Sequence, residues 1–336
     1  MQSSNSFFRP NRIFVEEAVA DLPLTRRILE RLPRSEVEEI DDIHQLKTRR
    51  ETKKSLLLAR KEADPLKEFA AMTTSCHGFY YSLDLVSNCH YECTYCILQS
   101  YLENNPILTI FTNIEEILER LEDQMHSLPK GSVVGTGRIA DSLALESLTG
   151  LNEKLIPFFG RREDCFLELK TKSDEVDQIL GLDHRGKTIV SWSLSPETII
   201  RREEYKTAPL SARLAAMKKC AEAGYKIGLH FDPVIFHDGW KTHYEDLIHE
   251  VFRYVSSDAI FWTGVGTLRF PMRQKRMMER RFPKNREIFD GLRSTDKRFL
   301  HYADALREEI YEALGNSLRE HVPPNRVFTC MEDHLG

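Results

Sequence analysis

Short runs of β-branched and aromatic residues alternate with amphipathic stretches of helical spacing between residues 79 and 268. We expect strands at 79–85, 107–112, 132–137, 166–170, 188–194, 226–232 and 259–265. Helical signals separate them, and two of these stretches begin at capping residues, Asn113 and Ser173. The alternation is typical of a parallel sheet with crossover helices. It predicts six or seven β/α units in a full or partial barrel, with functional residues at the carboxyl ends of the strands.

Both flanks of this region have patterns of their own. Upstream, residues 12–17 are strand-like and residues 24–32 are helical in spacing. Downstream, a basic segment precedes a helix predicted at 303–318 and a strand-like stretch at 326–330. We therefore expect an α/β fold with an N-terminal α/β extension (1–78), a partial (β/α)6-type barrel (79–268) and a C-terminal basic and helical extension (269–336).

The composition places the chain among globular enzymes. Its 336 residues are 41% hydrophobic, which suffices for one large core or two smaller ones. No stretch approaches the roughly 20 apolar residues that a membrane helix needs. The N-terminus also lacks the long apolar region of a secretory leader. These features predict a cytoplasmic protein with no membrane partner.

Positive charge is concentrated locally although the formal net charge is −5. The segment from Arg269 to Arg286 holds eight basic residues and the single acid Glu279. A second basic cluster consists of Lys47, Arg49, Arg50, Lys53 and Lys54. Such density can neutralise several phosphates, which makes nucleic acid a candidate partner of the Arg269–Arg286 segment. A solvated helix face is the alternative interpretation, and the sequence leaves both open.

Three cysteines carry the most specific chemical signal. Cys89, Cys93 and Cys96 have the spacing C-x3-C-x2-C and follow directly on the first predicted barrel strand. Three thiolates on one loop can bind three irons of a [4Fe-4S] cluster and leave the fourth iron open to a substrate. A structural zinc site would need a fourth ligand from His90, His77 or Cys76. A disulfide fits poorly with seven cysteines and no secretory leader, and unpaired thiols are the third alternative.

Polar residues at two other predicted strand ends are candidates for the site. Arg138 and Asp141 follow the strand at 132–137, where an arginine suits a phosphate or a carboxylate. His230 and Asp232 alternate with apolar neighbours, so both can point into the barrel. We expect substrate or cofactor contact, with proton transfer by His230. A hydrogen-bonded pair that holds the strand end is the structural alternative.

The cysteine spacing, the preceding strand and Tyr95 before the third cysteine resemble the radical S-adenosylmethionine (SAM) superfamily. Longer strings resemble its spore photoproduct lyase family, and they lie at 93–99, 111–118, 223–228 and 237–240. Similarity extends upstream to 14–17 and downstream to the basic segment, and so covers nearly the whole chain.

That resemblance implies a radical SAM partial barrel with two cofactors, a [4Fe-4S] cluster and S-adenosylmethionine. The reduced cluster would cleave the cofactor to a 5′-deoxyadenosyl radical that abstracts hydrogen from the substrate. In the lyases the substrate is a methylene-bridged thymine dimer in DNA, which must leave the base stack. A one-electron donor such as flavodoxin or ferredoxin is implied as a partner.

The resemblance also implies roles for individual residues. Lys172 matches the lysine expected at the cofactor carboxylate, Ser193 matches a serine nearby, and Tyr95 is expected to contact cofactor or substrate. Two positions depart from the family. Arg138 stands where the lyases have a cysteine that returns a hydrogen atom, and Ile97 replaces a tyrosine. Cys330 is a thiol that could substitute, although no sequence feature places it near the barrel mouth.

Together these observations predict a lyase-like radical SAM enzyme. Because of the two departures, we expect it to act on a substrate other than that of the lyases. Nucleic acid is the leading choice, with repair of a DNA lesion as its most specific form. One alternative is radical modification of a peptide or small metabolite. The other is a non-catalytic nucleic-acid-binding protein in which a metal or cluster has only a structural role and stabilises a loop.

Overall fold

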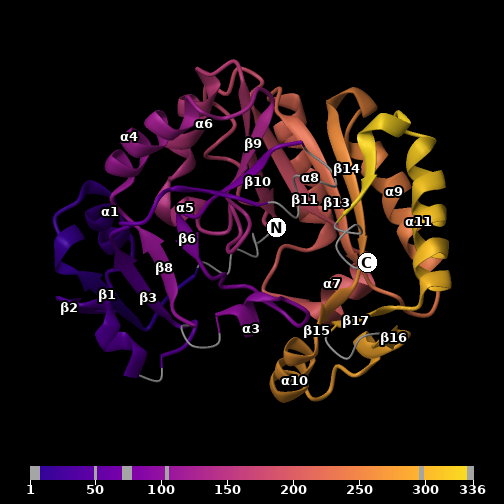
Figure 1. Cartoon of the computed structure of the whole chain (residues 1–336), viewed down its shortest axis with the longest axis horizontal. Helices are drawn as coiled ribbons and strands as arrows, with labels where there is room; N and C mark the ends of the chain where they lie inside the picture. The colour runs from indigo at the N-terminus through magenta and orange to yellow at the C-terminus, as the bar shows by residue number, and fades with distance from the viewer. Residues whose placement is uncertain (1–7, 49–50, 70–77, 103–105, 295–298, 331–336) are drawn as a thin grey trace.

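The computed structural model describes residues 8–48, 51–69, 78–102, 106–294 and 299–330. Its largest sheet has the strand order β18 (Val327–Thr329), β14 (Ile260–Thr267), β13 (Lys226–Val234), β11 (Thr188–Ser193), β10 (Cys165–Thr171), β9 (Ser132–Gly135), β5 (Tyr80–Leu83) and β4 (Leu66–Glu68). Neighbouring strands from β5 to β18 are parallel, and β4 pairs antiparallel with β5. The sheet curls into a partial barrel (Figure 1), which confirms the predicted fold class.

Helices cover the convex face of this sheet (Figure 1). They are α6 (Asn152–Gly160), α8 (Leu210–Glu222), α9 (Trp240–Tyr254) and α11 (Asp304–Arg319). The shorter α5 (Glu146–Thr149) and α7 (Glu197–Glu203) lie apart from this layer, α5 toward α1 (Pro23–Arg31) and α7 next to β12 (Glu204–Tyr205). Strand β13 shows how the layers form. Ile227, Leu229 and Phe231 alternate along it and are fully buried. His230, between Leu229 and Phe231, and Asp232, directly after Phe231, therefore point to the concave side of the sheet.

A second, five-stranded sheet contains β2 (Glu36–Ile40), β1 (Arg12–Glu16), β3 (Ser55–Ala59), β8 (Leu108–Phe111) and β6 (Val86–Ser87), in that order. The helices α1 (Pro23–Arg31) and α4 (Ile114–Met125) accompany it. The strand predicted at 107–112 is β8, which pairs with β3 and β6. Its assignment to the barrel was wrong, because hydrophobic periodicity identifies a strand but not the sheet that it joins. The three domain boundaries stay a prediction.

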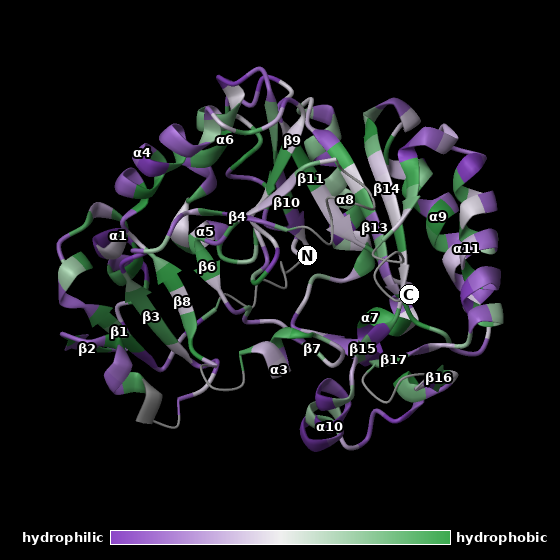
Figure 2. Ribbon diagram, in the orientation of Figure 1, coloured by the Kyte–Doolittle hydropathy of each residue, from purple (hydrophilic) through white to green (hydrophobic). Residues whose placement is uncertain are grey.

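Short elements surround the cysteine loop. β7 (Glu92–Cys93) pairs antiparallel with β12 (Glu204–Tyr205), and α3 (Leu98–Tyr101) follows the third cysteine. A small sheet of β15 (Arg269–Pro271), β17 (Phe299–Tyr302) and β16 (Leu292–Arg293) leads into α10 (Met272–Arg281). In Figure 2, β1, β3 and β8 are mainly hydrophobic, whereas α4 and α11 turn hydrophilic residues outward.

The two predicted helix starts have different outcomes. Asn113 does precede α4, but its side chain does not cap the helix. Its Oδ1 accepts a hydrogen bond from the backbone N–H of Lys61 at 2.9 Å, which ties the helix to the end of β3. Ser173 begins a turn rather than a helix, and its Oγ accepts from the N–H of Glu175 at 3.1 Å. Such a local bond competes with helix formation.

Candidate radical SAM site

The cysteine loop joins β6 to α3 and is held by side chains from three parts of the chain. Gln99 donates from Nε2 to the carbonyl of Cys93 at 2.8 Å, and Gln274 of α10 donates from Nε2 to the carbonyl of Cys96 at 2.8 Å. Lys53 donates from Nζ to the carbonyl of Tyr91 at 2.8 Å. Backbone carbonyls next to the candidate sulfur ligands are thus held by hydrogen bonds within the protein itself, which preorganises the loop.

The three thiols fit an iron–sulfur cluster better than a single ion. Cys89, Cys93 and Cys96 are all free cysteines. Burial raises the pKa of Cys89 to about 12, and burial raises the pKa of Cys93 well above its usual range. Metal coordination is what would stabilise such buried thiolates.

The sulfur spacing separates the zinc alternative from the cluster. Tetrahedral zinc at about 2.3 Å from each sulfur would bring the sulfurs to about 3.8 Å from one another. Within the described residues, these three sulfurs do not form a group whose atoms all lie within 4.8 Å. The three sulfurs are thus not all as close to one another as the ligands of one tetrahedral zinc ion would be.

A cavity of about 540 Å³ opens beside the loop at the carboxyl ends of the barrel strands. Its lining comprises Cys93, Tyr95, Cys96, Ile97, Lys170, Lys172, Ser193, Asp232, Pro233, Thr267, Leu268, Arg269, Phe270, Pro271 and Phe299. The candidate metal ligands Cys93 and Cys96 thus line the same cavity as polar residues at the carboxyl ends of β10, β11 and β13. The volume lies in the range typical of small-molecule sites. The structure brings together Tyr95, Lys172 and Ser193, the residues predicted to bind the cofactor.

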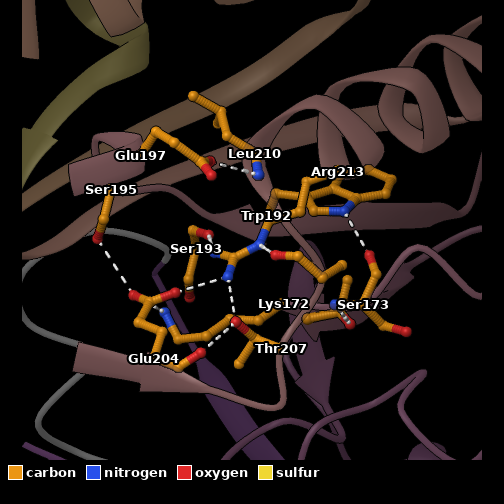
Figure 3. A network of polar contacts seen from close by, with 12 residues as sticks. Lys172, Ser173, Trp192, Ser193, Ser195, Glu197, Glu204, Thr207, Leu210 and Arg213 are labelled. Atoms are coloured by element: carbon orange, nitrogen blue, oxygen red, sulfur yellow. Dashed lines mark hydrogen bonds and ion pairs between the residues drawn. The ribbon is translucent and has the colours of Figure 1, made fainter. Parts of the chain in front are cut away.

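A buried carboxylate, Glu204, organises this wall (Figure 3). It is the cross-strand partner of Cys93, and its side chain is fully buried. Arg213 reaches Glu204 at 2.6 Å and Lys172 reaches it at 3.2 Å. The hydroxyl groups of Tyr95 and Ser195 also donate to it.

The charges around Glu204 decide its ionisation. Burial alone would raise its pKa, but Lys172, Arg213 and the Tyr95 hydrogen bond outweigh burial and lower the pKa to about 2. Glu204 is therefore an anion that holds the Lys172 ammonium at the cavity wall. No local pattern in the sequence marks Glu204 as a site residue, since only the pairing of β12 with β7 places it beside Cys93.

Asp141 anchors the loop after β9. Its carboxylate accepts from the backbone N–H groups of Leu143, Ala144 and Lys172 at 3.0, 2.9 and 2.7 Å, and from Thr171 Oγ1 at 2.6 Å. These four bonds connect the loop after β9 to the end of β10, and one of them holds the backbone N–H of Lys172. Asp141 is not among the described residues that line the cavity, so its contacts are those of a positioning residue.

Arg138 lies in the same loop but outside the described cavity lining. Its Nη1 is 4.0 Å from the carboxylate of Asp84, and its guanidinium lies 5.0 Å from the centre of the Phe69 ring. The side chain keeps 29% of its surface exposed. Arg138 therefore remains accessible to a polar group that approaches from solvent.

His230 lies beneath the cavity in a buried polar chain. Its Nε2 is 2.9 Å from Glu168 Oε1, and Tyr80 donates to Glu168 Oε2 at 2.5 Å. A Cβ at Gly264 would meet both Cys330 Sγ at 2.7 Å and His230 Nδ1 at 3.3 Å. The Cys330 thiol therefore points into the barrel beside His230, a position that the sequence did not indicate.

Comparison with known proteins identifies the family. Residues 8–327 match the spore photoproduct lyase family. A spore photoproduct lyase of Geobacillus sp. is 31% identical over 62% of this chain and 62% of that protein. The Bacillus subtilis spore photoproduct lyase is 25% identical over 84% of this chain and 85% of that protein.

Solved structures agree with this assignment at the level of the fold. A spore photoproduct lyase mutant with bound AdoMet and dinucleoside spore photoproduct has a TM-score of 0.82 at 23% identity and covers 96% of this chain and 98% of that chain. Within the described residues, no helix combines the length and hydropathy that a membrane crossing demands. From the match over residues 8–327, the chain belongs to the spore photoproduct lyase family of radical SAM enzymes.

Proposed function

We propose that this protein is a radical SAM lyase that repairs a thymine photolesion in DNA, and this replaces the expectation of a different substrate drawn from Arg138 and Ile97. The observation that carries the proposal is the shared wall of Cys93, Cys96 and the polar strand ends around one cavity. A bound [4Fe-4S] cluster and S-adenosylmethionine would together supply a 5′-deoxyadenosyl radical for hydrogen abstraction. The two alternative functions are not favoured, because the matches above are all with spore photoproduct lyases.

The residues in place have distinct proposed tasks. Cys89, Cys93 and Cys96 would hold three irons, and Lys172 and Ser193 would orient the cofactor carboxylate at the cavity wall. Glu204 and Asp141 fix Lys172 by its ammonium and by its backbone N–H. Tyr95 donates its hydroxyl to Glu204, so its ring face is the part left to contact cofactor or substrate.

We propose that the nucleic acid approaches over the first part of the Arg269–Arg286 segment. Arg269 lines the cavity and lies 3.5 Å from Asp232, while Arg273 and Arg276 are exposed on α10. Cations beside a cavity that receives a flipped-out lesion suit its flanking phosphates. Arg138 is proposed as a further substrate contact, and His230 as a proton-transfer group acting from beneath the cavity.

The test is direct repair. Cluster-loaded enzyme, S-adenosylmethionine and dithionite are incubated without oxygen with dinucleoside spore photoproduct, and the products are separated by chromatography. The proposal expects the methylene crosslink to be reversed and thymidine to be released, and expects no thymidine from a Cys93→Ala variant. Cofactor cleavage without any repair of this substrate would contradict the assigned lesion.

A further inference from the structure

A second hollow, of about 450 Å³, lies on another face of the cysteine loop. The cysteine loop and the start of α3 contribute Asn88, Glu92, Leu98 and Gln99 to the lining of this hollow. The 540 Å³ cavity described above is lined instead by Cys93, Tyr95, Cys96 and Ile97. The two sets share no residue. The loop that carries the sulfur ligands therefore forms a partition between two separate spaces.

The second hollow is basic. Five cations line it, and they come from three distant parts of the chain: Lys53, Lys54, Lys206, Arg280 and Arg281. Its two acids are already paired. Glu92 lies 2.5 Å from Arg281 and 3.7 Å from Lys206, and Glu51 lies 3.9 Å from Arg12. We call this surface the basic hollow. It presents an excess of positive charge on a chain whose formal net charge is −5.

Hydrogen bonds connect residues of the basic hollow to the loop that carries the three cysteines. Lys53 and Gln99, both part of its lining, donate to the carbonyls of Tyr91 and Cys93. Helix α10, which supplies Arg280, also donates to the carbonyl of Cys96 through Gln274. A molecule bound in the basic hollow would therefore contact the loop directly at Asn88 and Glu92, and through the side chains of Lys53 and Gln99.

We propose that the basic hollow docks an acidic one-electron carrier protein, of the flavodoxin or ferredoxin class, which reduces the cluster from this side. The inference rests on the proposed function, since it needs the cluster. In this electron transfer the carrier loses one electron and the cluster gains one. No covalent bond forms or breaks. Cofactor and substrate can occupy the cavity at the same time because the loop separates them from the carrier.

Charge and position favour a carrier over a nucleic acid here. A substrate strand must place its reacting base in the cavity, which is on a different face of the loop. Electron-transfer complexes use small interfaces and rely on charge complementarity to bring the partners together. Five cations against two carboxylates in the lining leave the basic hollow with net positive charge beside the loop, which fits that use.

The test measures binding of a purified, reduced bacterial flavodoxin to the cluster-loaded chain without oxygen. The perturbed variant is Lys54→Glu with Lys206→Glu, and Lys54→Glu alone serves if the double variant folds poorly. The matched control is Lys241→Glu with Arg253→Glu, because both lysine and arginine are exposed on α9, away from the loop. Duplex DNA is the second probe.

We expect the hollow variant to bind flavodoxin about tenfold more weakly than the control at low salt, with the difference shrinking as salt rises. Flavodoxin-driven cofactor cleavage should fall while dithionite-driven cleavage stays at the wild-type rate. Equal flavodoxin affinities in the two variants would overturn the inference. So would a hollow variant that loses DNA binding but keeps flavodoxin binding.

Failure of the proposed function has a different signature. It would show as absence of 5′-deoxyadenosine from loaded wild-type enzyme with dithionite, whatever the flavodoxin affinities. The binding comparison would still decide whether the basic hollow is the carrier surface.

Discussion

Replacing Glu204 by glutamine tests whether the cavity wall is organised by one buried anion. The variant keeps a polar group of nearly the same shape but leaves Arg213 without its counter-charge. Arg213 is fully buried, so water cannot take over that role. The wild-type pKa of Glu204, about 2 against an ordinary 4.5, sets the magnitude. It corresponds to about 3 kcal/mol of folding free energy at neutral pH, because each pH unit is worth about 1.4 kcal/mol.

The stability difference between wild type and Glu204→Gln should depend on pH in one direction. A carboxyl group whose pKa is lowered by folding contributes stability above its unfolded pKa and loses it as the pH falls through its folded pKa. The difference in unfolding free energy between wild type and Glu204→Gln should therefore be complete near pH 7. It should shrink as the pH drops from about 4.5 towards about 2.

The assay is urea unfolding followed by circular dichroism at several pH values. Glu222→Gln is the control, because Glu222 forms an exposed pair with Lys218 at 3.8 Å and should change stability by less than about 1 kcal/mol. A Glu204→Gln variant as stable as this control at pH 7 would refute the buried-anion account. So would a difference that does not depend on pH.

Three further substitutions test neighbouring parts of the site. Lys172→Ala should weaken S-adenosylmethionine binding about tenfold, as one charge-assisted contact is lost, while the visible absorption of the cluster stays unchanged; unaltered affinity in equilibrium dialysis would remove Lys172 from the cofactor site. Asp141→Ala should lower the unfolding free energy by at least about 2 kcal/mol, because four donors lose their acceptor, and Asp141→Asn should cost less. Gly264→Ala should destabilise the protein by about 1–3 kcal/mol, since the added Cβ would lie 2.7 Å from Cys330 Sγ. Gly181→Ala is the control, because a Cβ there would have no heavy atom of another part of the chain within 4 Å. Equal urea midpoints for the two variants would contradict the described packing of Cys330.

The sequence predicted those features that depend on local pattern. The strands at 166–170, 188–194 and 226–232 lie within the observed barrel as β10, β11 and β13, because their buried faces leave clear runs of apolar residues. The cysteine loop was predictable from spacing alone. Lys172 and Ser193 could be placed by resemblance, and both line the cavity.

What the sequence did not reveal depends on long-range pairing. Glu204 meets Cys93 only because β12 pairs with β7, and no periodicity encodes that contact. The strand at 107–112 was assigned to the wrong sheet for the same reason. The second basic cluster was visible in the sequence, and Lys53 and Lys54 from it join Arg280 and Arg281 in space. Arg49 and Arg50 of that cluster lie outside the described residues.

The most direct test of the open-iron account is cofactor cleavage by the reconstituted chain. The protein is loaded with iron and sulfide without oxygen, reduced with dithionite and given S-adenosylmethionine, and 5′-deoxyadenosine is quantified beside a Cys93→Ala control. The account predicts 5′-deoxyadenosine from the wild type and none from the variant, which should keep the wild-type circular dichroism spectrum. No 5′-deoxyadenosine from fully loaded wild type, or equal amounts from both proteins, would contradict it.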